Sequence, residues 1–169
     1  MSAELIEDLR YFLRINTSEY CPEGKQEAHS WLRQKYLDAG GLITWEKDVP
    51  DGGMIVLFGS YDGAVIIYSH YDVFPPNTAA WTVDPYSAGI VGNRIYGVGA
   101  RDTKANLLGF LNAIERLRFA EKPIPNIVFI LDGGEEIESP YLQEMVTFLD
   151  SVNSNWQGCI CADGGGDDT

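Results

Sequence analysis

The chain has 169 residues, 45% of them hydrophobic and 12% aromatic, a composition that can bury the core of one domain and argues against disorder. It carries 25 acidic residues against 12 basic ones, a formal net charge of −13. Nucleic acids and anionic membranes are bound mainly through basic surface, so this charge argues against both as partners and favours a bound cation.

No segment resembles a targeting signal or a membrane span. The first four residues contain an acidic side chain and no basic one, and the longest apolar runs, near 64–68 and 127–131, are too short to cross a bilayer. The three cysteines, Cys21, Cys159 and Cys161, lack the spacing of a disulfide framework, which favours free thiols in a reducing compartment. We therefore expect a cytoplasmic protein, with Cys159 and Cys161 packed in the core.

Two helices are predicted near the start of the chain. Ser2 can cap the first, and Leu5, Leu9 and Phe12 share one of its faces. The second covers about 25–39, where apolar residues recur at helical spacing until a pair of glycines ends the pattern.

Short apolar runs then indicate strands. Residues 54–58 and 64–69 are predicted strands joined by a tight turn, and His70 follows the second directly. From 73 to 99 the chain is rich in Pro, Asn and Gly, and a hairpin is predicted around Gly92-Asn93. An ordered loop of this length usually carries function.

The second half alternates helices and strands. A helix is predicted over about 104–119, then an apolar strand over 126–131 whose faces should both be covered. Ser139 and Pro140 predict the cap and first position of another helix, and 158–162 the last strand. This order predicts an α/β fold, a layered sheet of mainly parallel strands flanked by helices, with ligands bound at strand ends.

One imidazole and several carboxylates fall at the ends of these elements. His70, the pair Glu135-Glu136 and Asp163 each lie just past a strand, and Asp102 lies just before a helix. Such a set suits a zinc-like dication. Two like charges about 4 Å apart cost about 4 kcal/mol at an effective dielectric near 20, so the carboxylates need a cation if they converge. The residues therefore indicate metal-assisted hydrolysis.

Each of these residues also has an ordinary structural explanation. His70 could be a hydrogen-bonded core histidine, and the carboxylates could be helix caps or solvated turn residues. Their joint occurrence favours the metal interpretation. His29, in the middle of the second predicted helix, is expected to be structural.

Four segments, followed by Asp163-Gly164, carry a resemblance to a known family. They are His-Tyr-Asp-Val-Phe-Pro-Pro at 70–76, Trp-Thr-Val-Asp-Pro at 81–85, Ile-Tyr-Gly-Val-Gly-Ala-Arg-Asp-Thr-Lys at 95–104 and Gly-Glu-Glu-Ile-Glu-Ser-Pro at 134–140. In this order and spacing they resemble the zinc-dependent aminoacylase, acetylornithine deacetylase, succinyl-diaminopimelate desuccinylase and carnosine dipeptidase family. The resemblance implies a zinc-exopeptidase-like fold.

The resemblance implies a binuclear metal site. His70 and Asp163 would bind the first metal, Asp102 would bridge the two metals, and Glu136 would bind the second. Two divalent ions are implied, with zinc expected and cobalt or manganese as alternatives.

Two further carboxylates take catalytic roles by the same resemblance. Asp72 would orient His70, and Glu135 would act as the general base on the attacking water. The implied reaction is hydrolysis of an amide bond in an N-acyl amino acid or a dipeptide, so the expected partner is a small-molecule amide substrate.

Family members are more than twice as long as this chain. Residues 1–169 would then be the N-terminal part of an incomplete catalytic domain, without its C-terminal part and without the lid domain through which the parent protein is expected to form homodimers. The family takes a histidine for the second metal from that missing part. We therefore expect an incomplete second site and an inactive fragment.

Two alternatives to a hydrolase stay open. One is a truncated relative that binds a metal or a partner chain through its acidic edge without turnover. The other is a structural calcium or magnesium site, against which the imidazole of His70 argues because these hard cations prefer oxygen ligands.

Overall fold

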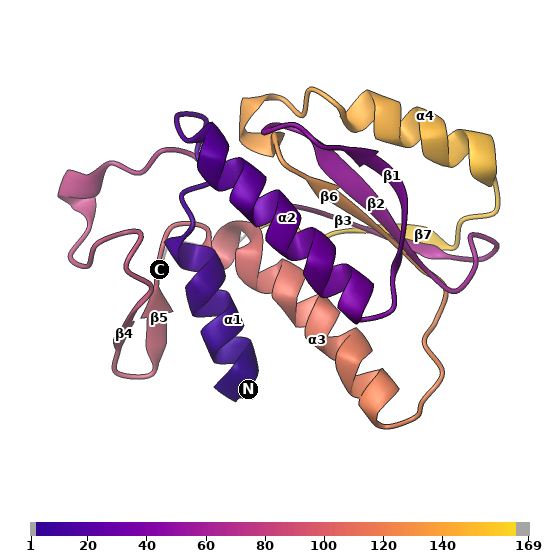
Figure 1. Cartoon of the computed structure of the whole chain (residues 1–169), viewed down its shortest axis with the longest axis horizontal. Helices are drawn as coiled ribbons and strands as arrows, with labels where there is room; N and C mark the ends of the chain where they lie inside the picture. Colours follow the sequence, from indigo (N-terminus) through magenta and orange to yellow (C-terminus); the bar gives the residue numbers. More distant parts are fainter. Residues whose placement is uncertain (1–2, 165–169) are drawn as a thin grey trace.

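The computed structural model describes residues 3–164 and shows one sheet between two layers of helices (Figure 1). One face of the sheet is covered by α1 (Ala3–Arg14), α2 (Pro22–Asp38) and α3 (Ala105–Phe119), and the other by α4 (Leu142–Val152). The α/β fold predicted from the sequence is confirmed. Ser2, the predicted cap of the first helix, lies outside the described residues.

The sheet has five strands in the order β1-β2-β6-β3-β7. The strands are β1 (Leu42–Lys47), β2 (Gly53–Phe58), β3 (Val65–His70), β6 (Ile127–Asp132) and β7 (Gly158–Cys161). β3 runs parallel to β6 and β7, whereas β2 runs antiparallel to both of its neighbours. The sheet is therefore mixed, with β2 alone running against the common direction.

The two strands predicted to follow one another across a tight turn are not neighbours. β6 lies between β2 and β3 and pairs with each along its full length. Five of its six residues are buried, and an apolar strand is most stable where two strands and two helical layers cover it. β1 was not predicted, because an edge strand that is only partly buried mixes polar and apolar residues.

Alternation along the strands supplies both core layers. Met54, Val56 and Phe58 face α1, α2 and α3, while Ile55 and Leu57 face α4. The predicted hairpin is present as β4 (Gly89–Val91) and β5 (Arg94–Tyr96). Within residues 3–164, no helix combines the length and apolar character needed to cross a membrane.

Two local predictions were wrong. Cys159 and Cys161 are exposed instead of packed in the core, because β7 is an edge strand with β3 as its partner. α4 begins at Leu142, not at Pro140, and Ser139 has a positive φ of 49°. The Ser139 side chain does not cap the helix and instead hydrogen-bonds to Asp132.

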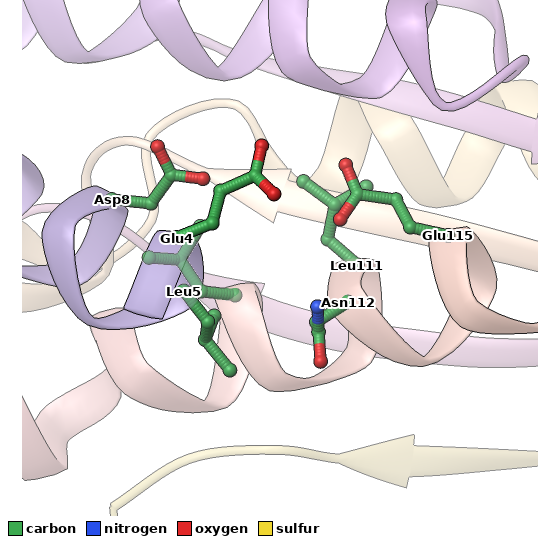
Figure 2. Close-up of a pocket in the computed structure, with 7 residues that line it drawn as sticks. Glu4, Leu5, Asp8, Leu111, Asn112 and Glu115 are labelled. Carbon is green, nitrogen blue, oxygen red and sulfur yellow. The ribbon is translucent and has the colours of Figure 1, made fainter. Parts of the chain in front are cut away.

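A small acidic pocket lies between α1 and α3 (Figure 2). Glu4, Asp8 and Glu115 line it, and Asp8 accepts a bond of 2.6 Å from Lys35. Burial raises the pKa of Glu115. Among the described residues these carboxylates do not form a group of converging metal-ligand atoms.

Candidate metal centre

The site is built where β3, β6 and β7 end. His70 is the last residue of β3 and lies in register with Asp132, the last residue of β6. Asp163 follows β7, and Asp102 lies in the turn Ala100–Lys104 that precedes α3. Parallel strands end at the same edge of a sheet, so side chains far apart in the sequence meet there.

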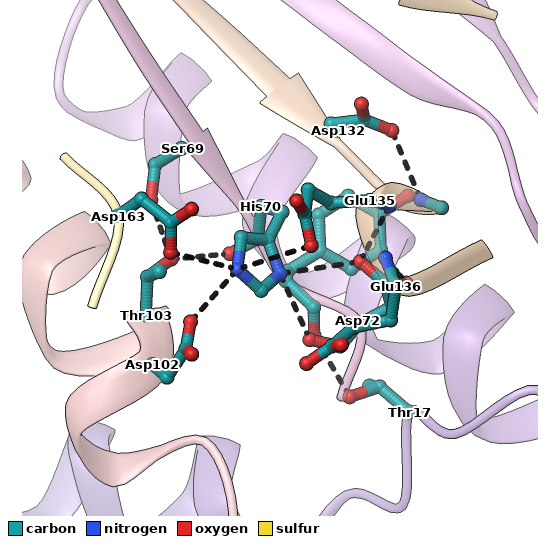
Figure 3. A network of polar contacts seen from close by, with 12 residues as sticks. Thr17, Ser69, His70, Asp72, Asp102, Thr103, Asp132, Glu135, Glu136 and Asp163 are labelled. Carbon is teal, nitrogen blue, oxygen red and sulfur yellow. Dashed lines mark hydrogen bonds and ion pairs between the residues drawn. The ribbon is translucent and has the colours of Figure 1, made fainter. Parts of the chain in front are cut away.

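Three ligand atoms converge at this edge. Nε2 of His70 lies 2.9 Å from Oδ1 of Asp102 and 3.4 Å from Oδ1 of Asp163 (Figure 3). One donor atom from each of the three lies within 4.8 Å of the others. The imidazole is buried and the two carboxylates are partly exposed, so a ring nitrogen and two carboxylate oxygens meet at a surface position. This is a donor set for a zinc-like ion.

Asp72 holds the other side of the imidazole. Nδ1 of His70 lies 3.3 Å from Oδ1 of Asp72 and 3.1 Å from its backbone carbonyl oxygen. Asp72 is buried and also accepts the backbone N–H groups of Glu135 and Glu136, at 3.1 and 3.0 Å. A proton held on Nδ1 leaves Nε2 as the nitrogen that can bind a metal.

The two glutamates lie on the short turn Glu135–Ile137 after β6. Oε2 of Glu135 is 3.9 Å from Nε2 of His70. Glu136 belongs to the same polar network, but its carboxylate accepts the Phe74 N–H and is not one of the three converging ligands. All six residues singled out from the sequence are therefore brought to one place, and three of them form the tight group.

Crowded negative charge shifts the pKa values here. Burial opposes the charge on His70, yet its hydrogen bond to Asp72 and the nearby carboxylates raise its pKa to about 10. Burial and a hydrogen bond with Asp163 raise the pKa of Asp102, and burial raises that of Glu135. The site thus holds protons tightly when no metal neutralises it, and a dication fits because it would replace those protons.

Hydrogen bonds from small polar residues stabilise the site, and these residues were not predicted from the sequence. The Thr103 hydroxyl donates to the His70 carbonyl oxygen at 2.7 Å and lies 2.6 Å from the Ser69 hydroxyl. Asn106 donates to the carbonyl oxygen of Ala162, the residue before Asp163, at 3.1 Å. The peptide bond between Asp102 and Thr103 is cis. None of these residues stands out in the sequence by itself, because their roles depend on contacts with segments far away in the sequence.

Asp132 is a buried carboxylate that was also missed. It accepts the Gly134 N–H at 2.9 Å and the Tyr68 hydroxyl at 3.1 Å, and the Ser139 side chain hydrogen-bonds to it. It thereby holds the turn that presents Glu135. The sequence does mark its place, because Asp132 is a charged residue at the end of an otherwise apolar strand.

His29 is placed away from the three converging ligands. Its ring is buried in α2, and its two nitrogens lie 3.0 Å from the Tyr71 hydroxyl and 3.0 Å from Glu46. This agrees with the structural role predicted for it.

The chain is similar to known peptidases. The profile of Peptidase family M20/M25/M40 matches residues 66–168. Human Beta-Ala-His dipeptidase is 41% identical over 86 residues, which are 50% of this chain and 17% of that protein. Cysteinylglycine-S-conjugate dipeptidase of Corynebacterium striatum is 31% identical over 116 residues, 66% of this chain and 26% of that protein.

Solved structures agree with the sequence matches. Human carnosine dipeptidase 1 superposes with a TM-score of 0.82 at 25% identity, covering 95% of this chain. The metallo-carboxypeptidase Sso-CP2 of Sulfolobus solfataricus gives 0.81 at 26% identity, covering 98%. The chain spans 38% of each of these two structures. Since the family profile covers more than half of the chain and includes the converging histidine and both aspartates, the chain belongs to Peptidase family M20/M25/M40.

Proposed function

We propose that this chain is the N-terminal, metal-binding part of a catalytic domain, and that the whole protein hydrolyses an amide bond in a dipeptide or an N-acyl amino acid. The observation that carries the proposal is the convergence of His70, Asp102 and Asp163 beside Glu135. The relatives add support, because the named dipeptidases and a 35% identical succinyl-diaminopimelate desuccinylase of Gluconobacter oxydans all cleave amides.

In this proposal His70, Asp102 and Asp163 hold one zinc ion, and Asp102 and Glu136 contribute to a second. Cobalt or manganese would suit the same donors. The metal, when bound, supplies Lewis-acid polarisation of the amide carbonyl and lowers the pKa of water. A further ligand for the second ion would come from outside the described residues, since the chain's one other histidine, His29, has its ring nitrogens on Tyr71 and Glu46.

Glu135 is the proposed proton carrier. Its carboxylate lies close to His70 but is about one-third exposed, so it can reach a water molecule and a substrate. It would take a proton from the attacking water and deliver it to the leaving amine. Asp72 would keep the His70 ring in one orientation through Nδ1, as its contacts with that nitrogen suggest.

The rest of the enzyme belongs to a longer protein in this proposal. The remainder of the catalytic domain would complete the second metal site, and a lid domain would carry substrate contacts and the homodimer interface. The comparison with solved structures supports a longer parent protein, because this chain spans only 38% of the solved structure of human carnosine dipeptidase 1. We further propose a cytoplasmic location, on the basis of the free thiols.

Zinc binding by the 169-residue chain tests the metal site directly. We expect Asp102→Asn to raise the zinc dissociation constant at least about tenfold, measured by competition with a chromophoric chelator. Asp150→Asn is the matched control, because Asp150 is exposed on α4 across the sheet from α3. Binding of calcium but not zinc, unchanged in His70→Ala, would remove the basis of the hydrolase proposal.

Turnover is tested by adding a separately produced C-terminal part and a panel of dipeptides and N-acyl amino acids. Hydrolysis that Glu135→Gln abolishes while zinc stays bound supports the proposal. Full zinc loading of the combined parts without any hydrolysis would favour the alternative, a non-catalytic metal-binding module.

A further inference from the structure

A buried tyrosine lies between His70, which carries the imidazole, and Asp72, which bonds to the turn of the two glutamates. Tyr71 separates His70 from Asp72, and its side chain extends in the opposite direction, towards α2. Its hydroxyl donates to the carbonyl oxygen of Gly52 at 3.1 Å and lies 3.0 Å from Nδ1 of His29. The side chain has no exposed surface.

The backbone of Tyr71 is held as firmly as its side chain. Its N–H donates to the carbonyl oxygen of Asp132 at 2.9 Å, and its own carbonyl oxygen accepts the Thr17 hydroxyl at 2.7 Å. Four separate segments of the chain therefore bond to this one residue. Any shift of Tyr71 would move His70 and Asp72 with it, because they are its covalent neighbours.

Tyr71 also touches the turn that carries the glutamates. A Cβ atom added to Gly133 would clash with the Tyr71 hydroxyl and with the carbonyl oxygen of Gly52. The tyrosine hydroxyl thus lies directly beneath the turn that leads from β6 to Glu135. Asp72, the residue that follows Tyr71, accepts the backbone N–H groups of Glu135 and Glu136 in this turn, so its bonds depend on how far apart the two segments lie.

The histidine that contacts the Tyr71 hydroxyl is itself held by further contacts. Nε2 of His29 lies 3.0 Å from Oε1 of Glu46 on β1, and Arg33 donates to the same carboxylate at 3.0 Å. The His29 ring is therefore bonded at both ends and cannot rotate without losing a buried partner.

We propose that Tyr71, supported by His29, is a positioning residue of the metal centre. It sets the distance between the segment of His70 and Asp72 and the turn of Glu135. It touches none of the ligand atoms and acts through these two segments. This inference rests on the proposed function, because it takes His70 as a metal ligand.

The test removes one hydroxyl from the 169-residue chain. We expect Tyr71→Phe to raise the zinc dissociation constant about tenfold and to change the visible absorption of bound cobalt(II), as loss of a supporting contact does at metal sites. Tyr36→Phe is the matched control, because Tyr36 is also fully buried and its hydroxyl has no hydrogen-bond partner among the described residues. Its zinc affinity and cobalt spectrum should stay unchanged.

A second variant guards against a folding defect. His29→Gln keeps the Tyr71 hydroxyl but removes the ring that supports it. We expect this variant to bind zinc more weakly while remaining folded by circular dichroism. Unchanged zinc affinity and cobalt spectra in the folded variants would overturn the inference, however much stability they lose. Zinc binding absent from the unaltered chain would overturn the proposed function and this inference together.

Discussion

The buried carboxylate of Asp132 offers a prediction whose size can be worked out from its contacts. Asp132→Ala removes the acceptor of the Gly134 N–H, which is buried, and of the Tyr68 hydroxyl, which is partly buried. A buried donor left without a partner costs about 1–3 kcal/mol, and the half-buried hydroxyl adds about 1 kcal/mol. We expect the free energy of unfolding to fall by about 2–4 kcal/mol.

Asp132→Asn should behave differently. The amide oxygen can still accept the Gly134 N–H, and the amide nitrogen can donate to the Tyr68 and Ser139 hydroxyls once they rotate. Burial raises the pKa of Asp132, so the folded state binds this proton more tightly than the unfolded chain does. Stability is therefore lost as the pH rises above about 4, and the asparagine variant avoids this loss.

Urea unfolding in the presence of a chelator measures both effects. Between pH 4 and 7 the stability of Asp132→Asn relative to the unaltered chain should increase with pH, while Asp132→Ala should be the less stable variant throughout. If the two variants lost equal stability at every pH, the hydrogen bonds assigned to Asp132 would not be what stabilises the turn.

Two further predictions concern buried groups near the site. Burial lowers the pKa of Lys104 to about 7, so this side chain takes up a proton on unfolding between about pH 7 and 10, and the stability of the unaltered chain relative to Lys104→Met should rise over this interval. Its amino group donates to the carbonyl oxygens of Phe12 and Ile15, and Lys104→Met should cost about 2–4 kcal/mol in urea unfolding at about pH 7. Gly133→Ala should destabilise the chain by about 1–3 kcal/mol, whereas Gly158→Ala, whose Cβ meets open space, should stay within about 0.5 kcal/mol; equal thermal shifts would contradict the close packing of the turn.

The residues that converge at the candidate site could be predicted because local signals mark their places. Apolar runs locate the strands; His70 closes β3, Asp163 is the first charged residue after β7, and Glu135 lies three residues beyond Asp132 at the end of β6. Side chains at the ends of parallel strands gather at one edge whatever the order of the strands. The site therefore did not depend on knowing which strands are neighbours.

Strand order and supporting contacts could not be predicted in this way. The insertion of β6 between β2 and β3 depends on pairing between segments far apart in the sequence. Ser139 looks like a helix cap, yet its side chain bonds to Asp132, because the turn geometry places it there. Cys159 and Cys161 look like core residues, and only the position of β7 at the edge of the sheet exposes them.

Residues 69–72 connect the candidate site to several elements of the fold. Ser69 hydrogen-bonds with Thr103 before α3, while His70 faces the carboxylates. Tyr71 contacts α2, and Asp72 binds the turn after β6. Successive side chains of an extended segment point to opposite sides, so one short stretch can bond to several elements at once. If His70 binds the metal as proposed, a change in how α2 packs on the sheet would reach it through the single peptide unit between Tyr71 and His70, so a substitution at His29 on α2 should alter metal binding.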